Sequence, residues 1–422
     1  MGLLSSAFLG LFTMLVAILG PAVLHIIRVS GPFLTPNPTV LGAGQGPIVI
    51  EDTVHCEDLH YHRPANLLFT ACEDVKETRF DWFPGLGHLD AKTVGRGSIH
   101  VVDPKTFKST RLAFENFNGP FVTHGIDVIE DPQDSDAVYI FAVNHLPNPD
   151  FTPDSPNNPA ARSQIELFHH ILHSTTVQHV RSIRHPLIQT PNDIYAASPT
   201  SFYVTNDHFY RSGLLRFIED IWPSAKWTNV IHVHLEQLHN VPSATASLTA
   251  SIAHEGLWNN NGLGHARSES EVIIASAIGG ELYLASRENN TLTVRDTIVF
   301  DTVTDNPSYY VDPYKSDAHD ASGFVIAGIS QGFYLPQTGT DPDALDAVQV
   351  WYAKEKGGQG HGWEKRLLFE DDGRRIRTAS AAVLVPVEME KDEGEGKQGV
   401  KKAWLFVTGF LSESMIAVLV EL

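Results

Sequence analysis

Short pairs of acidic and amide residues are the part of this sequence with the clearest capacity for chemistry. Carboxylate and amide oxygens are the hard donors that calcium takes in sets of six to eight. Taken singly, each pair has a simpler explanation, because Asn and Asp also favour turns for local reasons. Only a fold that brings the pairs together would make them a metal site. The pairs, together with one single amide, are Glu57-Asp58, Asn192-Asp193, Asn206-Asp207, Asp305-Asn306 and Asn261.

The signatures of two common enzyme classes are missing from the sequence. There is no phosphate-binding loop and no His-Glu-x-x-His motif, whereas Gly-x-Ser-x-Gly occurs once, at residues 328–332. Zinc proteases of the common kind are therefore disfavoured. A histidine-rich stretch between His55 and His62 keeps zinc open as a competing metal. In a strand, His60 and His62 would point to the same face, as two zinc ligands can.

Composition limits the classes of partner. The 422 residues include 30 basic and 50 acidic side chains, which gives a formal net charge of -20. Such a surface repels phosphate backbones, and we expect no nucleic-acid partner. The acidity is compatible with collecting divalent cations, although it also simply keeps a large protein soluble.

The elements that must position the oxygen donors have the pattern of short strands. Apolar and β-branched runs of four residues begin at positions 67, 138, 202, 282, 324 and 404. Their mean interval of roughly 67 residues suits four short strands with their loops, so the pattern favours an all-β propeller with six blades. The single intervals are uneven, and a pair of β-sandwiches stays open as the alternative. Short helices are expected at 159–170 and 209–221.

The N-terminal segment has its own pattern. Residues 3–27 contain no Asp, Glu, Lys or Arg and are long enough to span a membrane as a helix. No basic residue precedes the stretch, which favours a retained anchor over a cleaved signal peptide. We therefore expect a hydrophobic signal-anchor helix at 1–28, a linker at 29–46 and one folded domain at 47–422. The expected location is the secretory pathway, either membrane-anchored or secreted, where the sequon at Asn289 would accept a glycan.

Seven short motifs follow one another in the middle of the chain. They are Phe-Val-Thr-His-Gly-Ile at 121–126, Val-Asn-His at 143–145, Ser-Ile-Arg-His at 182–185, Asn-Asp-Ile at 192–194, Thr-Asn-Asp-His at 205–208, Asn-Asn-Gly at 260–262 and Val-Thr-Asp-Asn at 303–306. In this order they resemble the serum paraoxonase/arylesterase family. The resemblance extends from about residue 50 to about residue 330. It implies a six-bladed β-propeller with central calcium sites, and calcium-dependent hydrolysis of lactones and aryl esters.

The resemblance also implies two calcium ions at the centre of the propeller. Because neighbouring residues of a strand point to opposite faces, Glu57 and Asp58 can serve two different sites. The deeper, structural ion would be held by Asp58, the Ile126 carbonyl and Asp193. The catalytic ion would be held by Glu57, Asn192, Asn261, Asp305 and Asn306.

Two of the 21 histidines match the histidine pair of that family. His124 in Thr-His-Gly-Ile would activate a water molecule, and His145 in Val-Asn-His would support it. Imidazole titrates near neutral pH and can act as a general base, while calcium polarises the carbonyl. The expected partners are a small lactone or ester and a membrane contacted by the N-terminal segment.

The sequence departs from the family in its cysteines. Family members join an N-terminal strand to the C-terminus by a disulfide, but here the only cysteines are Cys56 and Cys72. They flank a turn at 63–66, and both a disulfide and two free thiols stay open. Closure of the propeller must then depend on strand pairing, or on a disulfide that stiffens one hairpin. A gluconolactonase-type enzyme with one metal and a non-enzymatic interaction platform are the alternative functions.

Overall fold

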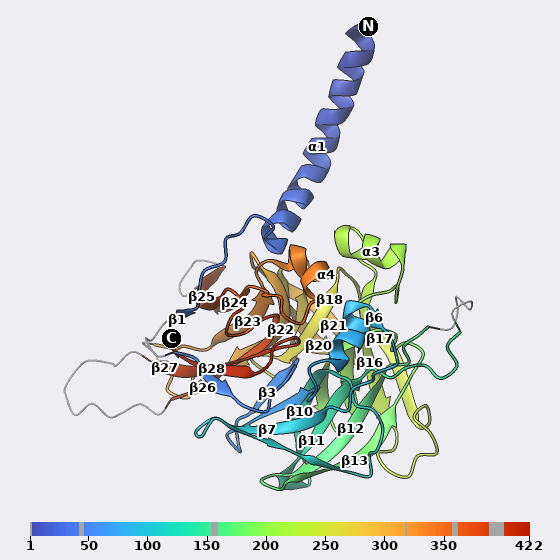
Figure 1. The fold of residues 1–422 in the computed structure, drawn as a ribbon, viewed down its shortest axis with the longest axis vertical. Helices are drawn as coiled ribbons and strands as arrows, with labels where there is room; N and C mark the ends of the chain where they lie inside the picture. The colour runs from blue at the N-terminus through green and yellow to red at the C-terminus, as the bar shows by residue number, and fades with distance from the viewer. Residues whose placement is uncertain (1, 42–45, 153–158, 317–318, 357–361, 388–400) are drawn as a thin grey trace, which may run out of the picture.

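The sheets of this protein follow one another around a common centre (Figure 1). The computed structural model describes residues 2–41, 46–152, 159–316, 319–356, 362–387 and 401–422. Strands dominate these residues and the few helices are short apart from the first, so the fold is all-β and propeller-like. This confirms the predicted fold class at that level.

Four of the sheets have four or five strands. Neighbouring strands in these sheets are antiparallel, except at the edge of the second sheet. The first sheet contains β3 (Leu59–His62), β4 (Leu67–Cys72), β7 (Ser98–Asp103) and β8 (Lys108–Arg111). The second contains β10 (Thr123–Asp131), β11 (Asp134–Asn144), β12 (Gln164–Ile171), β13 (Thr176–Ile183) and the parallel edge strand β9 (Ala113–Glu115). The third contains β14 (Pro191–Ser198), β15 (Ser201–Asn206), β16 (Thr228–Leu235) and β17 (Leu248–Leu257). The fourth contains β18 (Asn260–His265), β19 (Glu271–Ser276), β20 (Glu281–Glu288) and β21 (Thr291–Val299).

A nine-stranded sheet completes the arrangement. One part contains β22 (Val303–Tyr310), β23 (Gly323–Ile329), β24 (Val348–Glu355), β25 (Trp363–Asp371) and β1 (Val40–Leu41). The other part contains β26 (Ala379–Pro386), β27 (Lys402–Gly409), β28 (Met415–Glu421) and β2 (Ile48–Ile50). The two parts meet at a single parallel pairing between Asn306 and Ala381.

The innermost strands form a closed ring. Strand β3 contacts β10, and the contacts continue through β14, β18, β22 and β26 back to β3. At the outer edge of the last sheet, Ile48 of β2 pairs with Ala417 of β28 near the other end of the chain. Strand pairing therefore closes the structure, as expected. Cys56 and Cys72 are also bonded to each other, so the disulfide stiffens the β3–β4 hairpin.

The apolar runs are buried on both faces because each sheet packs between two others. Phe69 of β4 and Ile140 of β11, for example, belong to one cluster between the first two sheets. All six predicted runs lie in strands. Five are the second strand of their sheet or part-sheet, but the run at Leu282 lies in β20, the third strand of its sheet. That displacement contributes to the uneven spacing in the sequence.

One predicted helix is present and the other is wrong. Helix α3 (Leu214–Ile221) lies inside the expected range 209–221. The segment 159–170 forms most of β12 instead, paired with β11 and β13. Ile165 and Leu167 alternate with Glu166 at the period of two that a strand requires. The other short elements are α2 (Thr78–Asp81), β5 (Trp82–Phe83), η1 (Pro84–Leu86), β6 (His88–Leu89), η2 (Gly332–Tyr334) and α4 (Leu335–Thr338).

The N-terminal helix α1 (Gly2–Ser30) projects from the body of the protein (Figure 1). Its last turns contact the sheets: His25 Nε2 lies 2.7 Å from the Gly279 carbonyl oxygen, and Val29 is fully buried. Within the described ranges, the structure contains no helix with both the length and the apolar character that crossing a membrane requires.

Candidate metal and histidine site

The residues predicted to bind the catalytic calcium lie on or beside the innermost strands of different sheets. Asn192 is in β14, Asn261 is in β18, Asp305 and Asn306 are in β22, and Glu57 precedes β3. Each carries a buried oxygen with no hydrogen-bond partner among the described residues. These oxygens are Glu57 Oε2, Asn192 Oδ1, Asn261 Oδ1, Asp305 Oδ1 and Asn306 Oδ1.

Hydrogen bonds and close packing bring these residues together. Asn306 Nδ2 donates to Glu57 Oε1 over 3.0 Å, so β22 and the segment that precedes β3 meet at the centre. Gly262 allows β18 to approach β22 closely, because a Cβ at this position would lie 2.5 Å from Asn306 Cα. The orphaned oxygens therefore belong to one region of the centre.

The electrostatics of this region are unfavourable without a cation. Burial, with the charges of Asp305 and Asp58, raises the pKa of Glu57 well above its usual value. Burial and the charge of Asp58 do the same to the pKa of Asp305. Leaving buried polar oxygens without a partner costs about 1–3 kcal/mol each, and more when they are charged. Orphaned carboxylate and amide oxygens are the donors that calcium prefers, so the residues present fit a calcium ion.

The residues predicted to bind the structural calcium are also brought together, but their carboxylate oxygens already accept hydrogen bonds from the backbone. Asp58 Oδ2 accepts a hydrogen bond from the Ile126 amide over 2.9 Å, and Asp193 Oδ2 accepts one from the Leu263 amide over 2.6 Å. Burial raises the pKa of Asp58 to about 6 and the pKa of Asp193 well above its usual value. A cation here would share oxygens that already have backbone partners.

The two predicted histidines form a chain of contacts beside the orphaned oxygens. His124 Nδ1 lies 2.9 Å from His145 Nε2, and His145 Nδ1 lies 2.7 Å from the Ser163 hydroxyl. On its other side, His124 Nε2 lies 3.2 Å from Asn192 Nδ2 and 3.9 Å from Glu57 Oε1. The histidine pair therefore connects to the calcium donors through one ring nitrogen.

Both histidines are held in the neutral form. Burial, with the neighbouring His145, lowers the pKa of His124 well below its usual value. Burial lowers the pKa of His145 to about 4, although the carboxylate of Asp207 acts in the opposite direction. A neutral imidazole has a free lone pair at neutral pH, which a general base requires.

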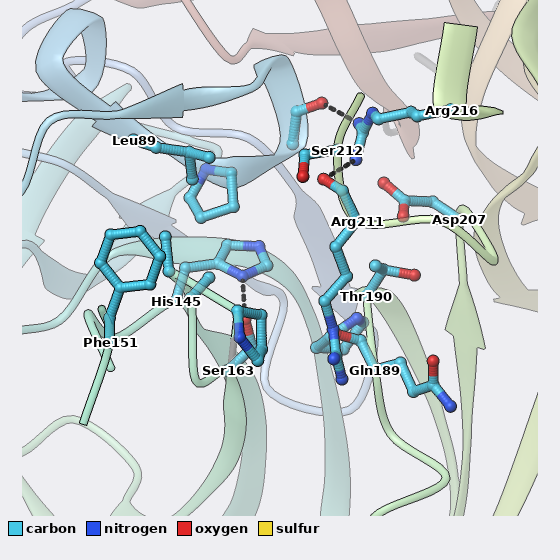
Figure 2. A pocket seen from close by; sticks show the side chains of 16 residues that line it. Leu89, His145, Phe151, Ser163, Gln189, Thr190, Asp207, Arg211, Ser212 and Arg216 are labelled. Atoms are coloured by element: carbon cyan, nitrogen blue, oxygen red, sulfur yellow. Dashed lines mark hydrogen bonds between the residues drawn. The ribbon is translucent and has the colours of Figure 1, made fainter. Parts of the chain in front are cut away.

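A cavity of about 290 Å³ lies beside His145 of the histidine pair. His145, Ser163 and Asp207 line it together with apolar groups such as Leu89 and Phe151 (Figure 2). Arg216 of α3 crosses its rim, because Arg216 Nη2 donates to the Gly85 carbonyl over 2.8 Å. The cavity can thus bring a small molecule to His145.

Sequence reasoning missed several residues of the site. Ser163 and Arg216 carry no motif that could have identified them. Asp207 had a signal, since it follows Asn206 in the Thr-Asn-Asp-His motif, and it alone of this pair faces the cavity. Asn206 instead has the local role that its residue type favours: its Oδ1 accepts from the amides of Gln189 and Thr190.

A buried arginine is a further residue that the sequence did not identify. Arg79 is fully buried beneath the site and donates to the Thr123 carbonyl over 3.1 Å. Its guanidinium lies 4.1 Å from the centre of the Phe83 ring, and that ring packs edge-on against His124. Arg79 therefore supports the histidine pair from behind.

Comparison with known proteins gives a family match. Residues 80–319, more than half of the chain, match the family model described as Arylesterase. Serum paraoxonase/arylesterase 2 of Gallus gallus is 28% identical over 238 residues, which cover 56% of this chain and 59% of that protein. Serum paraoxonase/arylesterase 1 of Mus musculus is 30% identical over 239 residues, with the same coverage. The chain thus spans about three-fifths of the length of the curated relatives it matches.

Two solved structures align with the chain at low sequence identity. A luciferin-regenerating enzyme aligns with a TM-score of 0.45 and 10% identity, covering 89% of this chain and 95% of that one. The periplasmic gluconolactonase of Pseudomonas aeruginosa aligns with a TM-score of 0.39 and 11% identity, covering 86% and 88%.

Proposed function

The chain belongs to the arylesterase family, and from that premise we propose that it is a calcium-dependent hydrolase of lactones, with aryl esters as secondary substrates. The observation that carries the proposal is the set of five orphaned oxygens beside a buried histidine pair. A metal-free structural role would not require oxygens without partners next to a neutral imidazole.

The proposed calcium ligands are the five residues with orphaned oxygens. When bound, calcium would polarise the ester carbonyl and stabilise the negative charge that develops on its oxygen. Asn192 has two tasks, because its Oδ1 is free for the ion while its Nδ2 contacts His124 Nε2. The same side chain would thereby fix the distance between metal and base.

The proposed base is His124. Because Asn192 Nδ2 lies at His124 Nε2, the proton of the neutral ring belongs on Nδ1, where it points to His145 Nε2. When water takes the place of Asn192 Nδ2 at Nε2 and gives up its proton there, His124 would become cationic, and His145 would stabilise that cation through the Nδ1 hydrogen bond. Ser163 fixes the orientation of the His145 ring at its far nitrogen.

The proposed substrate class follows from the cavity. A volume of about 290 Å³ is at the lower end of ligand pockets, which favours a small lactone ring over a long-chain ester. Leu89 and Phe151 would contact the apolar part of the substrate, while Asp207 and Arg216 make one wall polar (Figure 2).

We also propose the finer features of fold and location. Counting the nine-stranded sheet as two blades would give a six-bladed propeller, in agreement with the closed ring of inner strands. The N-terminal segment would keep the protein at a membrane of the secretory pathway, where the Cys56–Cys72 disulfide forms readily.

A one-ion lactonase of the gluconolactonase type is the second candidate. One observation favours it: the carboxylates of Asp58 and Asp193 already have backbone partners. Metal analysis after removal of loosely bound ions distinguishes the candidates, since two calcium ions per chain support the first and one supports the second.

The experiment that tests the proposed function is hydrolysis of a lactone panel and phenyl acetate by the full chain. Activity should disappear when a calcium chelator is added, and should return with calcium but not with magnesium, which dehydrates reluctantly. Hydrolysis that survives the chelator would contradict the proposal. Calcium binding without hydrolysis of any substrate would favour an interaction platform instead.

A further inference from the structure

We propose that His60, Asp127 and His265 form a second kind of metal site, which binds a divalent transition-metal ion such as zinc. The potential ligand atoms of these three residues, the His-Asp-His cluster, all lie within 4.8 Å of one another. They come from β3, β10 and β18, the innermost strands of three different sheets. The proposal is independent of the hydrolase assignment, because it concerns other side chains.

The geometry of the cluster is close to that of a bound ion. His60 Nδ1 lies 2.9 Å from Asp127 Oδ1, and His265 Nε2 lies 2.8 Å from Asp127 Oδ2. Zinc takes imidazole nitrogens and carboxylate oxygens at about 2.0–2.2 Å, so neighbouring ligand atoms lie slightly further apart than these contacts. A small outward rotation of the two rings would admit the ion.

The cluster is held in place by a second layer of contacts. Asp127 accepts hydrogen bonds from the amides of Val128 over 2.9 Å and Ala196 over 2.7 Å, which fix its carboxylate. The ring of Tyr195 packs against His265 with 4.5 Å between the ring centres. Metal-binding side chains are typically oriented by such supporting contacts, which reduce the entropy lost on binding.

The donor types discriminate between metals. Two imidazoles and one carboxylate suit zinc and its transition-metal neighbours, whereas calcium prefers oxygen donors. Only the catalytic calcium donors are separated from the cluster, since Glu57 lies three residues before His60, roughly 10 Å at about 3.3 Å per residue. The structural-calcium residues are nearer, because Asp58 lies two residues before His60 and Ile126 directly precedes Asp127.

An ion can reach the cluster and complete its coordination with water. The side chain of His265 is 42% exposed and that of His60 is 21% exposed, whereas Asp127 is buried. Three protein ligands with open positions is the pattern of a reactive or exchangeable metal site, while closed structural zinc sites have four.

The cluster differs from the zinc pair that the sequence left open as an alternative. That alternative joined His62 to His60, but His62 Nε2 lies 3.9 Å from Glu130 Oε1 and His62 is absent from the cluster. The partners of His60 come from other sheets, at positions 127 and 265. This difference supplies a control, because His62 and His60 lie on the same strand.

The test is a cobalt titration of the full chain in saturating calcium. Co²⁺ substitutes for zinc, and its visible absorption reports nitrogen and oxygen ligands. We expect one equivalent of Co²⁺ to bind and to be displaced by Zn²⁺. The variants His60→Gln and His265→Gln should each weaken binding by more than the roughly 100-fold that loss of a supporting residue costs.

The controls exclude binding by other histidines. His62→Gln and His234→Gln, the latter at an exposed position of β16, should bind Co²⁺ like the wild type. Thermal melting in calcium shows which variants are folded, and the two cluster variants lie on different sheets. The proposal is overturned if the wild type binds no Co²⁺, or if both folded cluster variants bind it as the wild type does. If His234→Gln weakens Co²⁺ binding as much as the cluster variants do, the binding belongs to surface histidines and the proposal is also overturned.

Discussion

The sharpest prediction concerns Asp305→Asn, which should have opposite effects on the metal-free and calcium-bound protein. Asp305 is buried, its Oδ1 has no hydrogen-bond partner within the described chain, and burial raises its pKa. In the metal-free protein, an ionised Asp305 would repel the carboxylates of Glu57 and Asp58. The near-isosteric amide removes that repulsion, so the metal-free variant should be more stable than the wild type.

The magnitude follows from the environment of the carboxylate. An uncompensated buried charge costs about 3–5 kcal/mol, and protonation of the cluster already relieves part of that cost. We expect the metal-free variant to be about 1–3 kcal/mol more stable, which is roughly 1–4 °C in melting temperature for a domain of this length. In saturating calcium the order reverses, because the variant has lost a charged ligand.

The assay is thermal melting of both proteins across a calcium titration, in which the two curves should cross. Asp343→Asn is the matched control, because Asp343 is exposed and lies outside the ring of innermost strands. The melting curve of this variant should follow that of the wild type. If metal-free Asp305→Asn melts at or below the wild type, and binds calcium equally well, then the argument from uncompensated charge is refuted.

Three further predictions follow from the same site. His124→Gln should retain calcium binding but lower kcat for lactones. It should also abolish the acidic limb of the pH–rate profile, which in the wild type should lie below the ordinary histidine range near pH 6.5 because burial lowers the pKa of His124. Unchanged kcat would exclude His124 as the base. Metal-free protein should lose stability as the pH rises from about 4 to about 6. The pKa of Asp58 is raised to about 6 in the folded state, so over this window the folded protein holds a proton that the unfolded protein has already lost. Chemical denaturation at each pH measures this, and a rise in stability over that window would contradict it. A retained anchor at 3–27 predicts that the protein sediments with membranes, and a soluble chain that begins between Pro21 and Gly31 would refute it.

The pH prediction corrects an expectation based on residue type alone. An exposed histidine loses its proton near pH 6.5, and the sequence offers no other value for His124. The structure buries the ring against Phe83 and His145, and desolvation disfavours the imidazolium. A pKa depends on the surroundings of a group, and those surroundings come from segments distant in the sequence.

Apolar runs predicted the all-β fold. The sequence singled out Asn192, Asp305 and His145 because they lie in short motifs with a fixed order, and their roles stay a prediction. Position 163 could not be identified, because its role depends on the register between β11 and β12. The helix expected at 159–170 was wrong for a related reason. A short segment can match both the helical period and the period of two of a strand, and here pairing with two neighbouring strands makes the segment β12.

The pairing of β2 with β28 has a consequence for how the chain is made. Synthesis runs from the N-terminus, so Ile48 leaves the ribosome long before Ala417, its partner. Glu57 follows β2 closely, and its carbonyl accepts hydrogen bonds from Ser380 and Thr408 of the late strands. Until those strands emerge, β2 is an unpaired edge and Glu57 lacks its supports. A stop codon before β28 should therefore leave β2 unpaired and yield an aggregating product rather than a slightly shortened protein.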